Sequence, residues 1–298
     1  MQLYGSIPVV KVQENMPISR TIANPDRLIV GCGYLGQRVA QRWQPPGRTF
    51  ALTRGRTDEL TALGVAPIIG DVLDPASLKN LPDVGAVVYA VGFDRNAGRS
   101  MREVYVEGLA NVLDALPGEP KFVYVSSTSV YAQTNGEWVD ENSATEPAEE
   151  SGQIVREAEA ILRAKRPSAI ILRFAGIYGP GRLLRRAASL RNGEPIAANP
   201  DQFLNLIHVD DGASAVVAAV ESGSAGEIYN VSDGQPPTRR EFYTELARLL
   251  EAPPPSFAPE GEGPNRRIAN NKMKRELGVQ LQFPSFREGL SASIDPAL

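Results

Sequence analysis

Short apolar runs and amphipathic stretches alternate along most of this sequence. Runs such as 27–30 and 87–91 are apolar almost without interruption, which is typical of strands covered on both faces of a sheet. The pattern predicts strands at 27–30, 48–53, 66–69, 86–91, 121–126 and 169–174. Between them it predicts helices at 37–43, 57–63, 74–81, 101–116 and 154–164. Strands that alternate with helices indicate crossover connections, so we expect a doubly wound α/β fold with a parallel sheet.

The pattern changes beyond residue 176, where Gly179-Pro-Gly181 interrupts the chain. Thr238 and Glu241 have the spacing of a capping box, which predicts that a helix begins there. The remaining elements expected in this half are a basic helix at 182–191, an alanine-rich helix at 212–222 and a strand at 227–231. We infer a smaller lobe that lies over the strand ends, where open α/β sheets bind ligands.

These changes divide the chain into three parts. Residues 1–25 form an N-terminal extension, 26–175 the α/β domain, and 176–298 mainly the C-terminal lobe, with strand 227–231 returning to the main sheet. The extension lacks the continuous apolar core of a signal peptide. It is interpreted as a loose arm, or as a mis-assigned start with Met16 as the true first residue; a short strand or partner-binding arm is the alternative.

The segment Gly31-Cys-Gly-Tyr-Leu-Gly36 directly follows the first strand and opens the first helix. In that context G-x-G-x-x-G is typical of the phosphate-binding turn of a Rossmann domain. Gly31 would permit the tight turn, Gly33 the approach of backbone to a pyrophosphate, and Gly36 the packing of helix on strand. Tyr34 and Leu35 belong to the same predicted site, where the helix N-terminus faces the phosphates. A merely tight strand–helix turn is the alternative.

Residues that follow the second, third and fourth predicted strands indicate which dinucleotide would bind and how it would fit. An acidic residue after the second strand would favour NAD, and an arginine would favour NADP. The chain has Arg54 and Arg56 there, so NADP is slightly favoured over NAD, unless both are solvated loop charges. Asp71 suits an adenine amino group, with a turn or capping role as the alternative. The small residues Ala90 and Gly92 would let a flat cofactor lie close.

Composition narrows the possible partners. The 298-residue chain has 31 Lys and Arg against 35 Asp and Glu, a net charge of −4, which argues against nucleic-acid binding. A single cysteine, Cys32, and a single histidine, His208, argue against a zinc site. No apolar run approaches the ~18 residues that a membrane span needs, so we expect a cytoplasmic protein without membrane contact.

Together these residues resemble the extended short-chain dehydrogenase/reductases of the NAD-dependent epimerase/dehydratase family. The segments that carry the resemblance are 31–36, 70–71, 123–131, 172–181 and 205–211. Membership implies a Rossmann domain with a small C-terminal substrate lobe. It also implies a Tyr-x-x-x-Lys pair on the helix after the fifth strand, in which the tyrosine moves the proton and the lysine lowers its pKa. The resemblance assigns Ser127 to the hydroxyl that binds the reacting oxygen.

The Tyr-x-x-x-Lys pair is missing from the matching stretch. One register places Ser151 and Val155 at the two positions, and a shift by one residue places Gly152 and Arg156 there. No tyrosine occurs between residues 131 and 178. The chain therefore resembles the atypical branch of the family, which keeps the cofactor site and loses the pair.

Several residues are candidates to replace the pair or to bind substrate. Tyr131 is the candidate acid–base group if it faces the cleft, and the alternative is that it packs beneath the site. Thr128, Tyr178 and Arg182 are substrate-binding candidates, with Arg182 binding a phosphate of a nucleotide-sugar-like molecule or forming part of a solvated basic helix. His208 is interpreted as a structural, hydrogen-bonded histidine.

Asp210 and Asp211 are expected to cap the alanine-rich helix. Two functions remain open at this point. The first is an NAD(P)-dependent oxidoreductase or sugar-nucleotide epimerase/dehydratase-like enzyme with altered acid–base residues, acting on a small molecule. The second is a dinucleotide-binding sensor or scaffold without turnover. The sequence leaves the substrate and the oligomeric state open.

Overall fold

A computed structural model describes residues 25–43, 46–182, 184–258 and 263–294 of the chain. The predicted N-terminal extension thus lies outside the described residues, except for its last position, Pro25. Among the described residues, no helix is both long and apolar enough to span a bilayer.

Seven parallel strands form the central sheet, in the order β10-β7-β5-β4-β1-β2-β3. The strands are β1 (Arg27–Val30), β2 (Thr49–Thr53), β3 (Ala66–Ile69), β4 (Ala86–Tyr89), β5 (Lys121–Ser127), β7 (Ile170–Phe174) and β10 (Ile228–Val231). The order reverses between β1 and β4, which creates the kind of crevice where open α/β sheets bind ligands. The predicted doubly wound α/β fold is confirmed.

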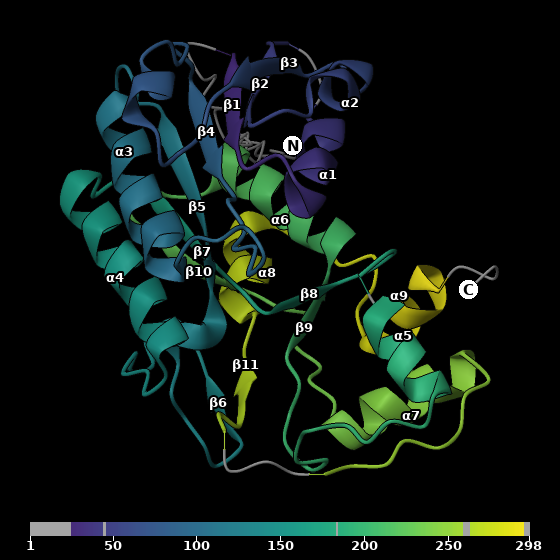
Figure 1. Ribbon diagram of the computed structural model, residues 1–298. Helices are drawn as coiled ribbons and strands as arrows, with labels where there is room; N and C mark the ends of the chain where they lie inside the picture. The colour runs from purple at the N-terminus through teal and green to yellow at the C-terminus, as the bar shows by residue number, and fades with distance from the viewer. Residues whose placement is uncertain (1–24, 44–45, 183, 259–262, 295–298) are drawn as a thin grey trace, which may run out of the picture.

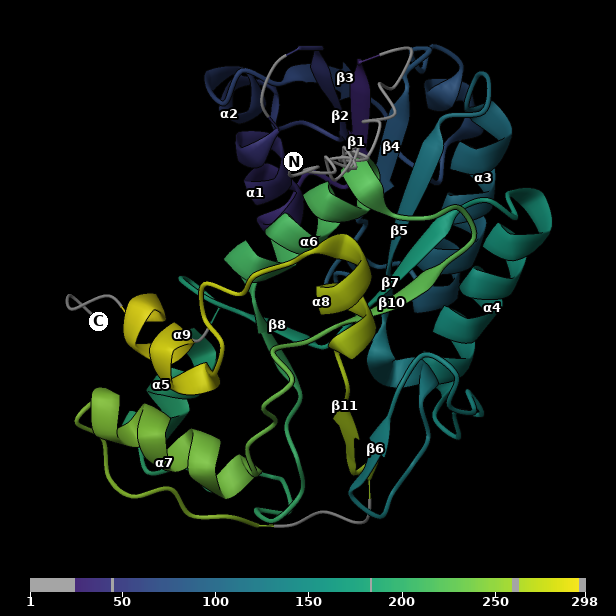
Figure 2. The same cartoon turned by 180° about the vertical axis from the view of Figure 1, so that it is seen from behind.

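Helices cover both faces of this sheet (Figures 1 and 2). One face packs on α1 (Tyr34–Arg42), α6 (Val209–Ser222) and α8 (Asn271–Leu277), and the other on α3 (Gly108–Ala115) and α4 (Glu150–Lys165). Side chains of β1 alternate between the two cores, with Ile29 in the first core and its neighbours Leu28 and Val30 in the second. Burial on both faces explains why the strands are apolar without interruption.

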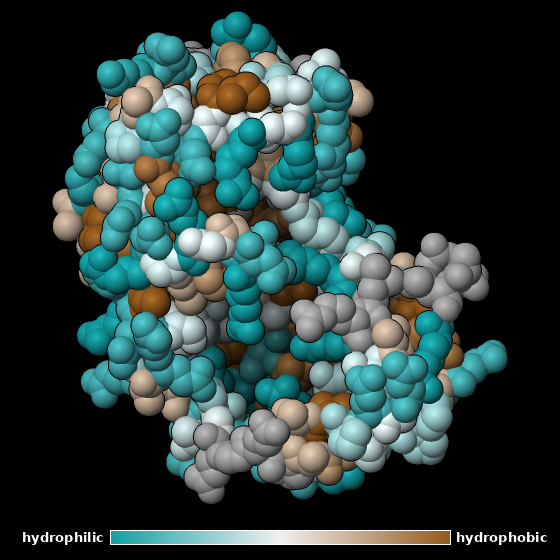
Figure 3. Space-filling model, viewed as in Figure 1, coloured by the Kyte–Doolittle hydropathy of each residue, from teal (hydrophilic) through white to brown (hydrophobic). Residues whose placement is uncertain are grey.

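The lobe is joined to this sheet by two short parallel ribbons. One pairs β8 (Gly176–Tyr178) with β9 (Leu206–His208), and the other pairs β6 (Glu137–Val139) with β11 (Arg266–Ile268). The lobe helices are α5 (Leu184–Arg191), α7 (Arg239–Leu249) and α9 (Phe286–Ser293), which share a separate apolar core. Figure 3 shows the surface hollowed between the sheet domain and the lobe.

The remaining elements are α2 (Thr57–Ala62), a π turn (Glu103–Glu107) that leads into α3, and the 3-10 turns η1 (Pro75–Leu78) and η3 (Thr128–Val130). The helix predicted at 74–81 is wrong, because only the four-residue η1 forms there. Asp74 caps this turn by accepting from the backbone N–H of Ala76. The predicted capping box is confirmed, since Thr238 and Glu241 bond reciprocally at the start of α7.

Candidate functional site

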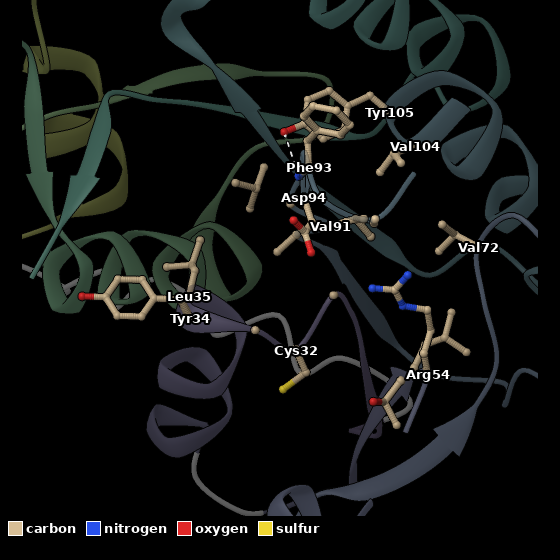
Figure 4. A pocket seen from close by; sticks show the side chains of 18 of the residues that line it. Cys32, Tyr34, Leu35, Arg54, Val72, Val91, Phe93, Asp94, Val104 and Tyr105 are labelled. Atoms are coloured by element: carbon tan, nitrogen blue, oxygen red, sulfur yellow. Dashed lines mark hydrogen bonds between the residues drawn. The ribbon is translucent and has the colours of Figure 1, made fainter. Parts of the chain in front are cut away.

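A cavity of about 970 Å³ lies at the carboxyl ends of the central strands (Figure 4). Its lining runs from the ends of β2 and β3, past the β1–α1 turn and the end of β4, to the ends of β5 and β7. The cavity therefore spans the point where the strand order reverses. Its size lies within the ordinary range for small-molecule and cofactor sites.

The glycine-rich turn forms one wall of this cavity. Gly31 has φ +91°, and a Cβ there would lie 2.6 Å from backbone atoms of Ala90. A Cβ at Gly36 would lie 2.7 Å from the carbonyl oxygen of Gly31, so the glycine allows α1 to pack against the turn. At Gly33 a Cβ would meet only the Arg56 guanidinium, at 3.9 Å. Gly33 is therefore the glycine whose open side faces the cavity.

The N-terminus of α1 points its backbone amides toward the same wall. No side chain caps this helix, and both Tyr34 and Leu35 line the cavity. Uncapped N–H groups together with the positive end of the helix dipole make this wall suitable for an anion. Cys32, also in the lining, is buried, and burial raises the pKa of its thiol to about 11.

Arg54 and Arg56 differ in how far they are already engaged. Arg56 donates from Nη2 to the carbonyl oxygen of Cys32 at 2.9 Å and lies 3.8 Å from the Glu59 carboxylate. Arg54 is exposed in the cavity wall and forms no ion pair with any residue that the structure describes. Figure 4 shows its side chain extending along the cavity. Arg54 is therefore the freer of the two cations to meet an anionic group.

The remaining residues predicted to bind the cofactor, Asp71, Ala90 and Gly92, also line the cavity. The Asp71 carboxylate accepts from the backbone N–H of Leu73 at 2.9 Å, which is the turn role left open by the sequence, and it still faces the cavity. Ala90 and Gly92 lie in the wall at the end of β4.

Ser127 lies at the far end of the cavity, where β5 ends. Its Oγ accepts from the backbone N–H of Ser129 at 3.1 Å, which leaves the hydroxyl hydrogen free to donate. Val155 of α4 lines the same end, whereas Arg156 is exposed and lies outside the lining. A side chain at position 152 would place its Cβ 2.5 Å from the carbonyl oxygen of Ser129. The geometry thus favours the register that puts Val155, not Arg156, at the lysine position.

Tyr131 does not face the cavity, which corrects its assignment as the candidate acid–base group. It is 1% exposed and absent from the lining. Its hydroxyl donates to Asn230 Oδ1 at 2.8 Å and accepts from Arg173 Nη1 at 3.0 Å. Burial raises the pKa of Tyr131, and the contacts with Arg173 oppose that rise only in part. The ring belongs to the same buried cluster as Val155 of α4, and of these two residues only Val155 lines the cavity.

Two of the three substrate-binding candidates are also corrected. Thr128 is 7% exposed within η3, and Tyr178 is 3% exposed and directs its hydroxyl at the carbonyl oxygen of Ser285 in the lobe. Neither lines the cavity. At Thr128 the turn η3 packs on α4, and the Tyr178 side chain packs in the lobe core against Gly289 of α9. Arg182 does line the cavity.

A buried polar network beneath Ser127 was not predicted from the sequence. Glu159 of α4 pairs with Arg173 of β7 through two hydrogen bonds of 3.0 and 2.8 Å. The Ser126 hydroxyl donates to the same carboxylate at 2.6 Å. Tyr131 completes the network by bonding Arg173. The sequence signal was the pair of charged residues at otherwise apolar positions of a predicted helix and strand.

The phenols that line the cavity are held in their protonated form. Burial raises the pKa values of Tyr34, Tyr105 and Tyr124, most strongly for Tyr124. The Tyr105 hydroxyl is further engaged as the acceptor of the Phe93 backbone N–H at 3.3 Å (Figure 4). None of these phenols has a neighbouring lysine in the cavity lining to lower its pKa.

His208 has the structural role expected of it, but the aspartates do not. The His208 side chain caps α6 by accepting from the backbone N–H of Asp210, and burial lowers its pKa. Asp210 instead pairs with Arg42 at 2.9 Å, and Asp211 accepts from the backbone of residues 282 and 283. The expected aspartate caps are therefore wrong, because α6 begins at Val209, before either aspartate. Within the described ranges, no cluster of three or more metal-binding side chains occurs.

Known proteins resemble this chain over nearly its whole length. Protein YeeZ of Escherichia coli is 28% identical over 86% of this chain and 95% of its own. A solved structure from Methylobacillus flagellatus, provisionally assigned as an NAD-dependent epimerase/dehydratase, is 32% identical with a TM-score of 0.72 and covers 90% of this chain and 96% of that one.

The dTDP-glucose 4,6-dehydratase DesIV of Streptomyces venezuelae, solved with NAD and TYD bound, is 25% identical with a TM-score of 0.76. The match covers 89% of this chain and 94% of DesIV. The family model for NAD dependent epimerases and dehydratases matches residues 28–232, from β1 to just past β10. The chain therefore belongs to the NAD dependent epimerase/dehydratase family.

Proposed function

We propose that this protein binds NADP or NAD in the cavity and is an oxidoreductase or epimerase/dehydratase-like protein with altered acid–base residues. The observation that carries the proposal is that one cavity joins the open side of Gly33, Arg54 and Ser127. These are the groups that would meet, in order, the pyrophosphate, the adenosine ribose and the reacting oxygen of a substrate. Among the described residues Arg54 has no ion-pair partner and the Ser127 hydroxyl donates to none.

The residues present fit a dinucleotide. Four arginines line the cavity against two aspartates, so its charge suits a ligand with two or three phosphates. The backbone at Gly33 and the amides of α1 would hold the pyrophosphate, while Ala90 and Gly92 leave room for a flat ring. Arg54 would pair a 2′-phosphate, and on that ground NADP is favoured over NAD.

The residues at the expected catalytic positions include no suitable proton acceptor, which limits the reactions they could support. A bound nicotinamide would supply or accept a hydride. Ser127 would orient a substrate oxygen by donating a hydrogen bond, but its ordinary hydroxyl is no base. Val155 is apolar where the family's pair would have its lysine. We therefore expect slow or undetectable turnover of simple alcohols and sugar nucleotides.

The sensor or scaffold function is the second candidate, and the same end of the cavity favours it. Val155 is apolar, and the hydroxyl of the buried Tyr131 already bonds Asn230 and Arg173, so neither residue would move a proton for a bound substrate. DesIV, which this chain resembles, has TYD bound with NAD, so a phosphate-bearing small molecule is the proposed ligand beside the dinucleotide.

The test combines binding with cofactor redox state. Calorimetric titration with NAD, NADP and their reduced forms should show binding, with NADP the tighter of the oxidised pair. The purified protein is then incubated with cofactor and candidate substrates, and both bound and released cofactor are assayed for oxidation state. Turnover supports the enzyme, whereas tight binding with unchanged redox state across substrates supports the sensor. Absence of dinucleotide binding overturns both.

A further inference from the structure

Tyr34 connects the glycine-rich turn to the loop that opens the C-terminal lobe. Its hydroxyl donates to the carbonyl oxygen of Pro180 at 2.9 Å, across 146 residues of sequence. A Cβ at Gly179 would lie 2.7 Å from that hydroxyl, so only a glycine there allows the approach. The contact fixes the segment from Gly179 to Arg182 beside the N-terminus of α1.

Both faces of the Tyr34 ring carry a guanidinium. Arg38 of α1 lies 4.4 Å from the ring centroid, and Arg182 of the loop lies 4.6 Å from it. The Arg38 charge is balanced by Asp210, whose carboxylate lies 3.5 Å away. Arg182 has no carboxylate partner among the described residues, and it faces the cavity. An arginine on an aromatic face keeps its N–H groups available at its edge for a second, anionic partner.

We propose that Arg182 binds the pyrophosphate of the dinucleotide and that Tyr34 is the positioning residue that holds it there. This inference rests on the proposed function. Tyr34 directly follows Gly33, so a guanidinium stacked on its ring lies beside the amides that would hold the pyrophosphate. The amides supply donors from one side and Arg182 a full charge from the other, which suits a dianion better than either alone.

The assignment differs from binding of a substrate phosphate by Arg182. A substrate role would place the guanidinium toward the hollow between the domains, free of the turn. The contacts instead join it to the first residue of α1, the element that defines the cofactor site. The C-terminal lobe would then contribute a charge to dinucleotide binding, and the dinucleotide would connect the two parts of the molecule.

The first experiment compares Arg182→Ala and Arg182→Lys with wild type by calorimetry. The probes are NAD, ADP-ribose, which keeps the pyrophosphate, and adenosine, which lacks it. We expect Arg182→Ala to weaken NAD and ADP-ribose about ten-fold or more and to leave adenosine unchanged, because a charge-assisted bond is lost. Arg182→Lys should retain part of the affinity, since lysine keeps the positive charge but lacks the paired N–H donors of the planar guanidinium. Arg186→Ala is the matched control, because Arg186 stacks on Tyr243, outside the cavity lining.

A double-mutant cycle tests the positioning role of Tyr34. Tyr34→Ala should weaken ADP-ribose in the wild-type background but have little further effect beside Arg182→Ala, since both remove the same interaction. Tyr34→Phe keeps the ring and should retain most of the affinity. Additive losses, or equal loss of adenosine, would overturn the positioning role.

Unchanged binding of NAD and ADP-ribose by Arg182→Ala overturns the assignment of Arg182 while leaving the proposed function intact. If wild-type protein itself binds neither probe, the proposed function and this inference are both overturned. If Arg182→Ala weakens only the binding of an added phosphate-bearing substrate, Arg182 would instead be assigned to substrate binding.

Discussion

The two ends of the cavity use their polar groups in opposite ways. Around Gly33 and Arg54, backbone amides and a guanidinium face the cavity and have few partners within the protein. Around Ser127, Glu159, Arg173 and Tyr131 bond one another beneath the cavity and do not line it. Tyr105 and Tyr124 do line the cavity, with pKa values that burial raises. The Ser127 hydroxyl lines the cavity and donates to no residue that the structure describes.

This difference separates binding from chemistry in the same fold. The first end is equipped to hold phosphates, because its donors are unsatisfied until a ligand arrives. At the second end Glu159, Arg173 and Tyr131 satisfy one another, which stabilises the sheet. The phenols that line the cavity have pKa values raised by burial and no lysine in the lining to lower them, so they are poor proton acceptors. This difference between the two ends is what favours slow turnover with intact binding.

The largest effect is expected from breaking the buried pair beneath Ser127. Glu159→Ala leaves the Arg173 guanidinium buried without its carboxylate, which should lower the free energy of unfolding by about 3–5 kcal/mol. The measurement is urea denaturation of variant and wild type. Glu157→Ala, on the same helix, is the control, because its pair with Arg102 is exposed and should cost less than about 1 kcal/mol. Equal small losses in both variants would show that the network does not stabilise this end.

The next effect concerns the other end of the cavity. Gly33→Val should weaken NAD and NADP by roughly 100-fold or more, because the new side chain occupies the space needed by the pyrophosphate. The fold should tolerate it, since a Cβ there meets nothing closer than 3.9 Å. Gly263→Val, at an open position outside the cavity lining, is the control. Calorimetry measures the dinucleotide affinity, and thermal melting shows whether the variant is folded. Normal affinity in a folded Gly33→Val protein would contradict binding of the pyrophosphate at Gly33.

A smaller effect sharpens the choice of cofactor. Arg54→Ala should weaken NADP about ten-fold or more and leave NAD nearly unchanged, because only NADP has a 2′-phosphate for the guanidinium. Arg95→Ala removes a charge from an exposed position outside the cavity lining and should leave the NADP/NAD ratio as it is. Equal losses for both dinucleotides, or a wild-type preference for NAD, would reject the role of Arg54.

The sequence predicted the first end of the cavity far better than the second. The glycine-rich turn is local, since Gly31 and Gly36 are close in sequence and their role follows from strand–turn–helix geometry alone. Its neighbours, such as Arg54, follow strand ends whose place in the sheet the apolar pattern already implied.

The second end depends on packing between distant segments. Tyr131 bonds Asn230, 99 residues away, and the direction of its ring is set by α4 and β10, which no local pattern reveals. The start of α6 was misplaced for a related reason, because histidine rarely ranks among N-cap residues and two aspartates followed it. Tyr34 was predicted as a site residue, but its contact with Pro180 joins segments 146 residues apart and has no sequence signature.

Stability and rate should respond differently to substitution of Tyr131 and of Ser127. Tyr131→Phe removes a hydroxyl that bonds Asn230 and Arg173, so it should lower the free energy of unfolding by about 1–3 kcal/mol. Because this phenol is buried and its pKa is raised, the same variant should leave dinucleotide affinity and any hydride-transfer rate unchanged. Ser127→Ala should do the reverse, with a loss of stability limited to its bond with the Ser129 backbone N–H and a slower rate, since its hydroxyl lines the cavity. Denaturation and single-turnover kinetics on both variants make the comparison. A roughly 100-fold slower rate in Tyr131→Phe at wild-type stability would instead assign this tyrosine to proton transfer, and the two ends of the cavity would no longer differ in kind.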